Sequence, residues 1–378
     1  MIDYEILRVI WWLLLGVLLI GFAVMDGFDM GVAMLLPFSG RTDMERRIII
    51  NTVAPVWEGN QVWLILGAGA IFAAWPLVYA AVFSGMYIAL FLALLGLIVR
   101  PVSFKFRSKM THPYWRSSFD GALCISSFVP ALIFGVAIGN TLQGVPFHFD
   151  ESLRVFYTGT FWGLLNPYSI ICGLVSVAMM MMHGGVYLML KSNDSHILRR
   201  TTSLVYGAII VMLILFTLNG YLTLNTVKGF HIIDAVHNGV SNPLLKKVTT
   251  AVGAWDTNYR LYPLLWGVPF AAYMFALLTA ICVRMHKLGI AFITSGLCIA
   301  SIIATVGVSI FPFILPSTTH LSSSLTVWDA SSSKATLTVM LIATLIFVPI
   351  VIAYTSWVYR VLRGKVTAAS VDENHSSY

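Results

Sequence analysis

The stretch PVWEGNQVWLIL, residues 55–66, places an ionisable side chain directly before an apolar run. From Val62 onward the residues are typical of a membrane span, whereas Glu58 lies just ahead of them. Hydrocarbon offers a carboxylate no water, so such a residue is costly within a span and is a functional candidate by default. The stretch therefore predicts a membrane protein with a polar site near one end of its helices.

The composition of the whole chain agrees with this interpretation. Of its 378 residues, 58% are hydrophobic and 10% are charged, whereas a soluble domain carries about 25% charged residues. The mean hydropathy is +0.85. The net charge of +7 does not indicate nucleic acid, because the basic residues lie in short loops between apolar runs, as they do in oriented membrane proteins. The composition excludes a soluble domain and predicts a multi-pass membrane protein.

We expect about nine membrane-spanning helices in one all-α transmembrane domain covering residues 1–378. A span requires about 20 mostly apolar residues. A break between the second and third spans is predicted at AAWPL, where Pro76 favours a tight turn. The N-terminus does not read as a cleavable signal, because acidic residues precede its apolar run. The candidate spans are roughly 9–36, 53–74, 77–99, 119–142, 162–190, 203–226, 261–283, 288–311 and 335–360.

The distribution of basic residues predicts the orientation of these spans. Nine spans place the N-terminus and four loops on one side, which together carry 7 of the 23 Lys and Arg residues. The other side, with the C-terminus, carries the remaining 16. Cytoplasmic loops are enriched in Lys and Arg. The N-terminus is therefore predicted to be periplasmic and the C-terminus cytoplasmic.

Three ionisable residues of consecutive spans fall at a similar depth near the cytoplasmic side. Asp29 precedes the end of the first span at Leu36 by about 10 Å, and Glu58 lies roughly 8 Å into the second. Arg100 ends the third span. A carboxylate that is partly withdrawn from water can bind and release protons near neutral pH, so the acids are candidates for a proton entry. An ion pair between Arg100 and an acid, holding the spans together, is an equally good reading.

The neighbours of these residues favour structural roles at first reading. Asp26, one helical turn before Asp29, is interpreted as structural because MDGFDMG also reads as a helix distortion. Asn60 and Gln61 are typical of hydrogen bonds between membrane helices. Trp57 and Trp63 suit a membrane interface, and the deeper of the two could instead line a cavity.

The sequence contains no convincing site for a metal or another cofactor. Only one of nine histidines, His183, lies within a span, and a haem held by two axial ligands requires two. The methionines at 179–182 are interpreted as adaptable packing. The cysteines all lie in apolar runs without C-x-x-C spacing and are interpreted as buried packing residues: Cys124, Cys172, Cys282 and Cys298.

Several segments together make the chain resemble a known family. The segments are AVMDGFDMGVAML, NTVAPVWEGNQVWLILGAGAIFAAWPL, RPVSFKFRSK and SSLTVWDASSSKATLTVMLI. They resemble subunit II of bacterial cytochrome bd ubiquinol oxidase of the proteobacterial type, and the likeness extends from residue 1 to the C-terminal SSY. The G-F-D-M-G and W-E-G-N-Q-V-W blocks are distinctive when they occur together.

The resemblance implies a subunit of a terminal respiratory oxidase in the bacterial inner membrane. The complex would oxidise ubiquinol and reduce oxygen to water with protons from the cytoplasm. Haems of types b and d would be ligated by subunit I, and a small single-span subunit could accompany the pair. This chain would bind no haem alone, could hold a quinone, and would support assembly and part of a proton route.

The resemblance also suggests roles for individual residues. The family places an acid, often Asp, at the position of Glu58 in a proton route, and Asp29 and Arg100 match the same polar region. The positions of Trp57 and Trp63 border a quinone or an oxygen path, with Asn60 and Gln61 as possible contacts. His183 falls where relatives need no histidine, which argues against a haem ligand there.

Two other classes of function stay open at this point. A proton-coupled secondary transporter would show inverted repeats and broken helices near the membrane midplane, whereas these acids lie near the cytoplasmic ends and no repeat is evident. A purely structural assembly subunit would need no titrating carboxylate. An absorption spectrum of the complex purified from its native membrane would separate these classes.

Overall fold

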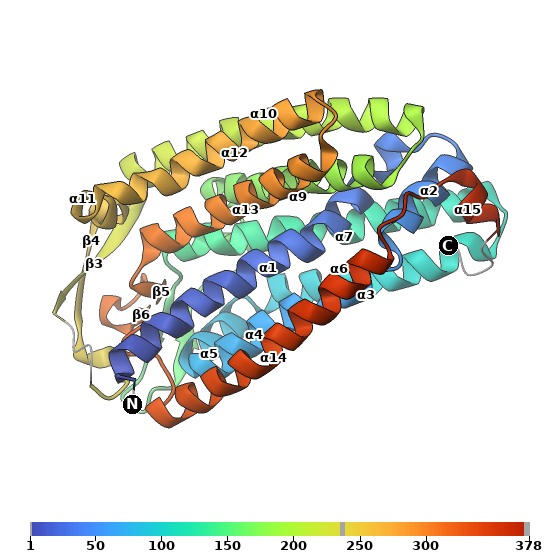
Figure 1. Cartoon of the computed structure of the whole chain (residues 1–378). Coiled ribbons are helices and arrows are strands. Elements are labelled where there is room, and N and C mark those ends of the chain that lie inside the picture. Colours follow the sequence, from blue (N-terminus) through green and yellow to red (C-terminus); the bar gives the residue numbers. More distant parts are fainter. Residues whose placement is uncertain (1, 235–238, 374–378) are drawn as a thin grey trace.

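The computed structural model of the chain describes residues 2–234 and 239–373. Long helices, roughly parallel or antiparallel, form an elongated bundle (Figure 1). Among the described residues, eight helical segments are long and apolar enough to cross a membrane. These long helices are α1 (Tyr4–Ser39), α6 (Tyr87–Phe106), α7 (Pro113–Gln143), α9 (Pro167–Lys191), α10 (Ser195–Asn225), α12 (Gly267–Arg284), α13 (Leu288–Ile310) and α14 (Lys334–Val361).

A ninth span is divided into short helices. The segment Trp57–Ala74, which contains α3 and α4, meets α5 at an angle of 119°. The bend lies at Trp75, and Pro76 starts α5. The predicted turn at Pro76 is therefore confirmed, and the total of eight to nine spans agrees with the sequence. The shorter helices are α2 (Asp43–Val53), α3 (Trp57–Asn60), α4 (Val62–Ala74), α5 (Pro76–Gly85), α8 (Phe161–Leu164), α11 (Thr257–Leu261) and α15 (Ala368–Glu373).

Several predicted span boundaries are wrong. The spans predicted to start at 119 and 203 start at Pro113 and Ser195. The range 77–99 is divided at Met86, so that α5 stands apart and α6 begins at Tyr87. Helix α6 continues six residues beyond Arg100, which therefore lies inside the helix and does not end it. Residues 37–52 were expected as a loop but contain most of α2, which starts with a capping box between Thr42 and Glu45.

Helices α1 and α9 pack closely at the centre of the bundle. A Cβ atom on Gly31 would lie 2.0 Å from the carbonyl oxygen of Met180, and one on Gly184 would lie 2.5 Å from the backbone nitrogen of Val32. Glycine at both positions is required because it lets the two backbones approach without a side chain between them. This contact fixes the position of the α1 segment that carries the acidic residues.

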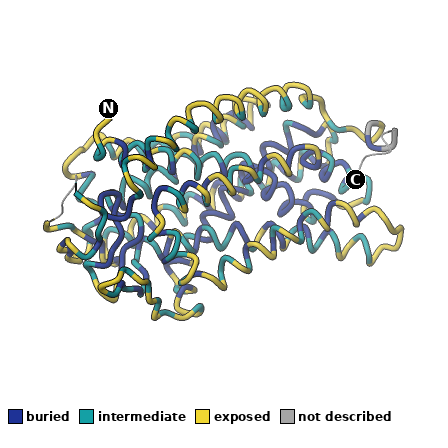
Figure 2. The backbone as a smooth tube through the Cα atoms, turned by 90° about the horizontal axis from the view of Figure 1, so that it is seen from below, coloured by how far each residue is buried: buried dark blue, intermediate teal, exposed yellow. Residues whose placement is uncertain are grey.

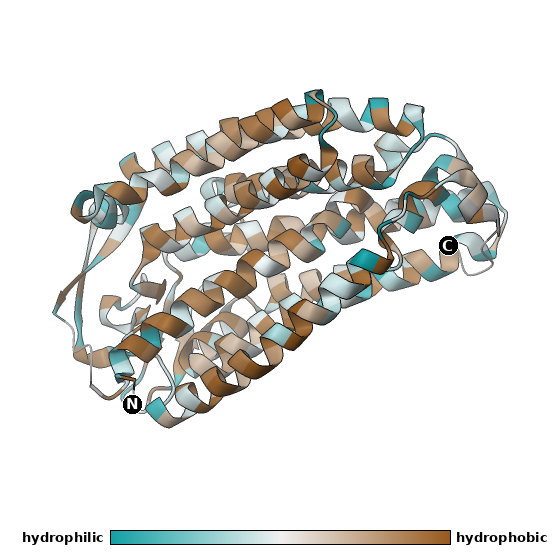
Figure 3. Cartoon of the chain, viewed as in Figure 1, coloured by the Kyte–Doolittle hydropathy of each residue, from teal (hydrophilic) through white to brown (hydrophobic). Residues whose placement is uncertain are grey.

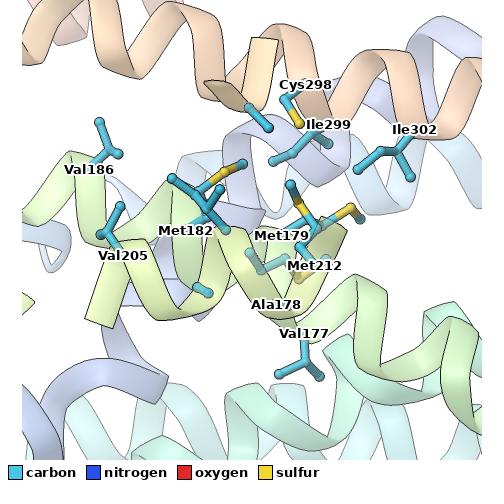
Figure 4. Packing of buried hydrophobic residues seen from close by; sticks show 14 of the residues in the cluster. Val177, Ala178, Met179, Met182, Val186, Val205, Met212, Cys298, Ile299 and Ile302 are labelled. Atoms are coloured by element: carbon cyan, nitrogen blue, oxygen red, sulfur yellow. The ribbon is translucent and has the colours of Figure 1, made fainter. Parts of the chain in front are cut away.

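Methionines fill the core around α9. Met179, Met180 and Met182 are buried in a core cluster to which α1, α7, α10, α12 and α13 also contribute. Figure 4 shows Met179 and Met182 beside residues of α10 and α13. Met is unbranched and polarisable, so it fills irregular gaps between helices. The interpretation of the Met run as packing is confirmed for these three residues. The cysteines are free thiols, two of them buried and two half-buried.

Within residues 2–234 and 239–373, three antiparallel strand pairs add strand structure that the all-α expectation did not include. The pairs are β1 (Phe147–Phe149) with β2 (Val155–Tyr157), β3 (Lys228–Asp234) with β4 (Lys247–Val252), and β5 (Phe313–Leu315) with β6 (Leu325–Thr326). Strands β3 to β6 lie at the end of the bundle that also holds the N-terminus (Figure 1). The first pair lies beside them, because the Val145 amide next to β1 donates to the carbonyl oxygen of Pro316 next to β5. Each pair falls within a loop assigned to the N-terminal side.

Hydrogen bonds join the loops that the sequence assigned to the N-terminal side. The hydroxyl group of Tyr4 donates to the carbonyl oxygen of Ser332 at 2.7 Å. The Ser332 amide in turn donates to Ala74 at 2.8 Å, and the Val145 amide donates to Pro316 at 3.0 Å. The predicted division of the loops between two ends is therefore seen in the structure.

Charged side chains link the helices at the opposite end. Asp120 of α7 binds Arg107 at 2.5 Å and Arg46 at 2.9 Å. Asp43 of α2 binds Arg107 at 3.0 Å and Arg116 at 2.6 Å. These pairs tie α2 and α7 to the segment that follows α6.

The outer surface of the bundle is apolar. Exposed residues line the outer helices (Figure 2), and hydrophobic residues cover their length between more polar ends (Figure 3). In the most apolar 18-residue stretch of α14, only 6% of the residues are buried within the chain. Such a surface requires lipid or a partner subunit around it.

Candidate functional site

A fully buried ion pair connects α1 to α6. An Nη1 hydrogen of Arg100 is donated to Oδ1 of Asp26 over 2.7 Å, and both side chains are 0% exposed. The expected pairing of Arg100 with an acid is thus present, and its partner is Asp26. Both charges are withdrawn from solvent, so water does not stabilise them and each charge depends on the other for compensation.

Asp29 lies one helical turn further along α1 and has different partners. Its Oδ2 accepts a hydrogen bond of 2.7 Å from the amide nitrogen of Asn60 in α3. The amide oxygen of Asn60 accepts a second bond, of 2.8 Å, from the hydroxyl group of Tyr359 in α14. Asn60 therefore joins the first helix of the chain to the last spanning one, and Asp29 is fully buried at the inner end of this connection.

Several polar atoms around these residues are buried without a protein partner. One carboxylate oxygen of each aspartate belongs to this set, as do two nitrogens of the guanidinium group. Buried polar groups in proteins are normally hydrogen-bonded, either to the protein or to internal water. The set consists of Asp26 Oδ2, Asp29 Oδ1, Arg100 Nε, Arg100 Nη2, Trp57 Nε1 and Gln61 Nε2. The arrangement thus supplies both donors and acceptors to small polar molecules in the interior. We call the residues Asp26, Asp29, Asn60, Arg100 and Tyr359 the buried polar cluster.

Glu58 points away from the buried polar cluster. Its side chain is 68% exposed, and Oε1 lies 3.9 Å from Nζ of Lys105, which is itself 58% exposed. The expectation that Glu58 is withdrawn from water is therefore wrong for this chain on its own. Helix α3 has four residues, and Asn60 lies on its buried face whereas Glu58 lies on its exposed face.

The two tryptophans of the stretch occupy separate surroundings. Trp57 is buried and stacks on Phe104 of α6, with ring centroids 5.5 Å apart. Trp63 is half-buried, and its ring covers Gly21 of α1, where a Cβ atom would lie 2.5 Å from it. Both rings therefore fix α3 and α4 against neighbouring helices.

The structure brings together part of the predicted site and adds residues that the sequence did not single out. Asp29, Arg100 and Asn60 belong to one buried region, while Glu58 does not. Tyr359 and the pairing role of Asp26 were missed. Tyr359 lies in the last turn of a span, and its depth matches that of the acids, but nothing local marks it as a partner of a residue 299 positions away.

The surroundings of His183 do not fit an axial haem ligand. Its Nδ1 lies 2.7 Å from the hydroxyl oxygen of Ser295, and its Nε2 lies 3.1 Å from the carbonyl oxygen of Val24. The ring stacks on Phe292 with centroids 4.5 Å apart. Both ring nitrogens are engaged within the chain, so neither is directed at an open position. Within residues 2–234 and 239–373, no group of three or more His, Cys, Asp or Glu is arranged to hold a metal ion.

Comparisons with known proteins agree on one family. Residues 7–362 match the model of the family described as cytochrome bd terminal oxidase subunit II. Cytochrome bd-I ubiquinol oxidase subunit 2 of Escherichia coli K12 is 49% identical over the full length of both chains. Cytochrome bd ubiquinol oxidase subunit 2 of Bacillus subtilis is 31% identical over 95% of this chain and 96% of its own.

A solved structure shares the fold of the chain. One chain of the bd oxidase from Geobacillus thermodenitrificans superposes with a TM-score of 0.69, covering 94% of this chain and 98% of its own, at 16% identity. At this identity the likeness concerns the fold alone.

Proposed function

Because the chain belongs to the cytochrome bd terminal oxidase subunit II family, we propose that its buried polar cluster carries protons within a quinol oxidase. The chain is a subunit of a terminal respiratory oxidase of the bacterial inner membrane, a quinol:oxygen oxidoreductase. The comparisons give the transporter alternative no support. The observation that carries the proposal is the buried Asp29, held by Asn60 next to the Asp26–Arg100 pair.

The overall reaction defines what such a cluster must supply. Reduction of one oxygen molecule to two water molecules consumes four electrons and four protons, and oxidation of two quinols supplies the electrons. We propose that the protons consumed enter from the cytoplasm and that part of their route lies in this chain. A proton route requires groups that exchange protons, spaced so that water can bridge them.

The buried polar cluster meets these requirements. Asp29 can take up and release a proton at its free Oδ1, while Oδ2 keeps the bond from Asn60. The fixed charge of Arg100 is balanced by Asp26, so the region does not carry an uncompensated positive charge that would repel protons. The unpaired atoms of Trp57 and Gln61 extend the polar surface along α3 and its junction with α4.

Glu58 has a different place in the proposed route. An exposed carboxylate in a membrane-spanning segment is stable only where water or a protein partner faces it, because lipid does not solvate charge. We propose that Glu58 and Lys105 face subunit I or a water-filled entrance beside it, and that Glu58 delivers protons to or from the cluster. The engagement of Asn60 with Asp29 and Tyr359 favours a role inside the route over a quinone contact.

The side on which the route opens follows from the basic loops. We propose a periplasmic N-terminus and a cytoplasmic C-terminus, in line with the 16 to 7 distribution of Lys and Arg. The end that carries the Asp43, Arg107 and Asp120 network would then be cytoplasmic. The acids of α1 lie nearer to that end of the helix, which ends at Ser39.

The haems of the complex are proposed to lie in subunit I. Membership of a cytochrome bd family implies haems in the complex, and we infer that types b and d are ligated by the partner. The support from this chain is that both ring nitrogens of the buried His183 are engaged. A small single-span accessory subunit is part of the same proposal.

His183→Ala should leave the haem spectrum of the assembled complex unchanged. The ring is hydrogen-bonded to Ser295 and Val24, and we propose that it ligates no haem. The expected cost is in stability, since the substitution empties a buried, stacked position. The measurement is the reduced-minus-oxidised absorption spectrum of the purified two-subunit complex. Loss of one haem band with both subunits still present would show that the haem assignment is wrong.

Glu58→Gln should assemble normally and turn over more slowly, because glutamine keeps the shape of the side chain and cannot ionise. General acid–base groups contribute about 10²–10⁴-fold, but an exposed group has water beside it, which could reduce the loss to about tenfold or less. Glu58→Asp should stay active because it keeps the titrating group. Quinol-driven oxygen uptake per complex compares the two variants, and full turnover of Glu58→Gln would remove this residue from the route.

A further inference from the structure

An open hollow of about 590 Å³ lies where α1 ends and α10 begins. It is separate from the buried polar cluster and belongs to the end of the bundle that carries most basic residues. Three arginines contribute to its wall together with apolar side chains and one hydroxyl group. The lining residues are Pro37, Phe38, Arg41, Arg199, Arg200, Ser203 and Leu204.

One of the arginines is fixed in place by the protein. Arg200 donates to Oε2 of Glu45 at 2.8 Å and to the carbonyl oxygen of Ser39 at 3.0 Å. The same Glu45 oxygen accepts the backbone amides of Arg41 and Thr42. Burial raises the pKa of Glu45, but its bonds from Arg200 and from these two amides outweigh burial and lower the pKa to about 2. Glu45 therefore stays ionised and balances Arg200.

The other two arginines of the lining are Arg41 and Arg199. Arg41 and Arg199 are exposed, and in the part of the chain that the structure describes neither guanidinium group lies within 4.0 Å of a carboxylate oxygen. Because Glu45 balances Arg200, the hollow has two uncompensated positive charges, those of Arg41 and Arg199, beside the fixed Arg200–Glu45 pair. A guanidinium group binds phosphate oxygens through paired hydrogen bonds.

The apolar part of the wall indicates what carries the phosphate. Phe38 is a large apolar side chain that is 58% exposed, and Pro37 and Leu204 adjoin the same hollow. Helix α1 has 36 residues and is therefore about 54 Å long, whereas a bilayer with its headgroups is about 40–45 Å thick. The end of α1 thus reaches the headgroup layer, where a phosphate and an acyl chain are found together.

We propose that this hollow binds the headgroup of an anionic phospholipid, with the phosphate on Arg41 and Arg199 and the upper acyl chain against Phe38 and Leu204. Basic pockets between spanning helices on the cytoplasmic side are suited to such headgroups. Ser203 adds a hydroxyl donor at the lining. The lipid binds at the junction of α1 and α10 and holds these two helix ends together.

The experiment uses the complete complex in detergent and a matched pair of double variants. Arg41→Gln with Arg199→Gln removes the two uncompensated charges without touching Glu45 or Arg200. Arg284→Gln with Lys287→Gln removes the same charge from exposed residues at the end of α12, outside the hollow. Native mass spectrometry during titration with a short-chain phosphatidylglycerol gives the dissociation constant for each complex.

We expect the first double variant to bind phosphatidylglycerol about thirtyfold more weakly than the unaltered complex. Each basic residue near the membrane surface contributes about 1 kcal/mol to lipid binding, two residues are lost, and about 1.4 kcal/mol corresponds to tenfold in affinity. The control should bind as the unaltered complex does, and phosphatidylcholine should bind weakly to all three. Equal binding of phosphatidylglycerol by both double variants would overturn the proposal. Displacement of the lipid by millimolar inorganic phosphate would also overturn it, because the site would then recognise a soluble anion.

Discussion

The Arg100→Gln complex is expected to lose about 3–5 kcal/mol of stability, the usual cost of removing one member of a buried ion pair. Its partner Asp26 would be left as a charge in a region where both side chains are now 0% exposed. Glutamine is shorter and carries no charge, so it cannot balance the carboxylate. The measurement is the thermal denaturation of the purified complex, followed by the loss of its haem spectrum.

Two further variants show whether the loss belongs to the pair. Asp26→Asn combined with Arg100→Gln leaves no stranded charge, so the double variant should be more stable than either single one. Arg260→Gln breaks the exposed contact with Asp256 at 2.5 Å, and a surface pair of this kind contributes about 0–1 kcal/mol. Unchanged stability of Arg100→Gln would contradict the burial of the pair.

Much of the architecture could be predicted because it depends on local composition. Apolar length and the distribution of Lys and Arg along the chain predicted the spans and the two ends of the bundle. The break at Pro76 followed from the chemistry of proline. The division at Met86 was missed although Ser84 and Gly85, a pair typical of helix breaks, directly precede it. The apolar residues on both sides of this pair read as one span.

The direction of Glu58 shows where the prediction of the site ends. The sequence gives its depth, but successive residues of a helix are rotated by about 100°, so Glu58 and Asn60 must face nearly opposite ways. Which one faces inward depends on the rotation of α3, which is set by the stacking of Trp57 on Phe104 and by the bond from Asn60 to Asp29. These contacts join residues that are distant in the sequence, so no local pattern reveals them.

The partner of Arg100 was open for a related reason. Asp26 and Asp29 are one turn apart on the same face of α1, and both are chemically able to pair with a guanidinium group. The structure assigns Asp26 to Arg100 and Asp29 to Asn60. The choice depends on which carboxylate the Arg100 side chain of α6 reaches in the folded bundle, and this contact joins residues 74 positions apart.

Asp29→Asn is expected to lower turnover about 10²–10⁴-fold, the range for loss of a group that transfers protons. The effect should exceed that of Glu58→Gln, because Asp29 is fully buried and has no bulk water to replace it. An amide at this position still offers an oxygen to the nitrogen of Asn60, so the link to Tyr359 and the assembly of the complex should persist.

The most direct test of the proton route is the quinol-driven oxygen uptake of the Asp29→Asn variant. The uptake is expressed per complex, and the amount of complex is measured by haem absorbance. Tyr359→Phe is a comparison within the buried polar cluster. It removes one hydrogen bond to Asn60 and leaves every carboxylate in place, so it separates a disturbed hydrogen-bond network from the loss of the carboxylate. The account predicts a normal haem spectrum with uptake reduced about 100-fold or more in Asp29→Asn, and a far smaller loss in Tyr359→Phe. Full uptake by an assembled Asp29→Asn complex would contradict the account.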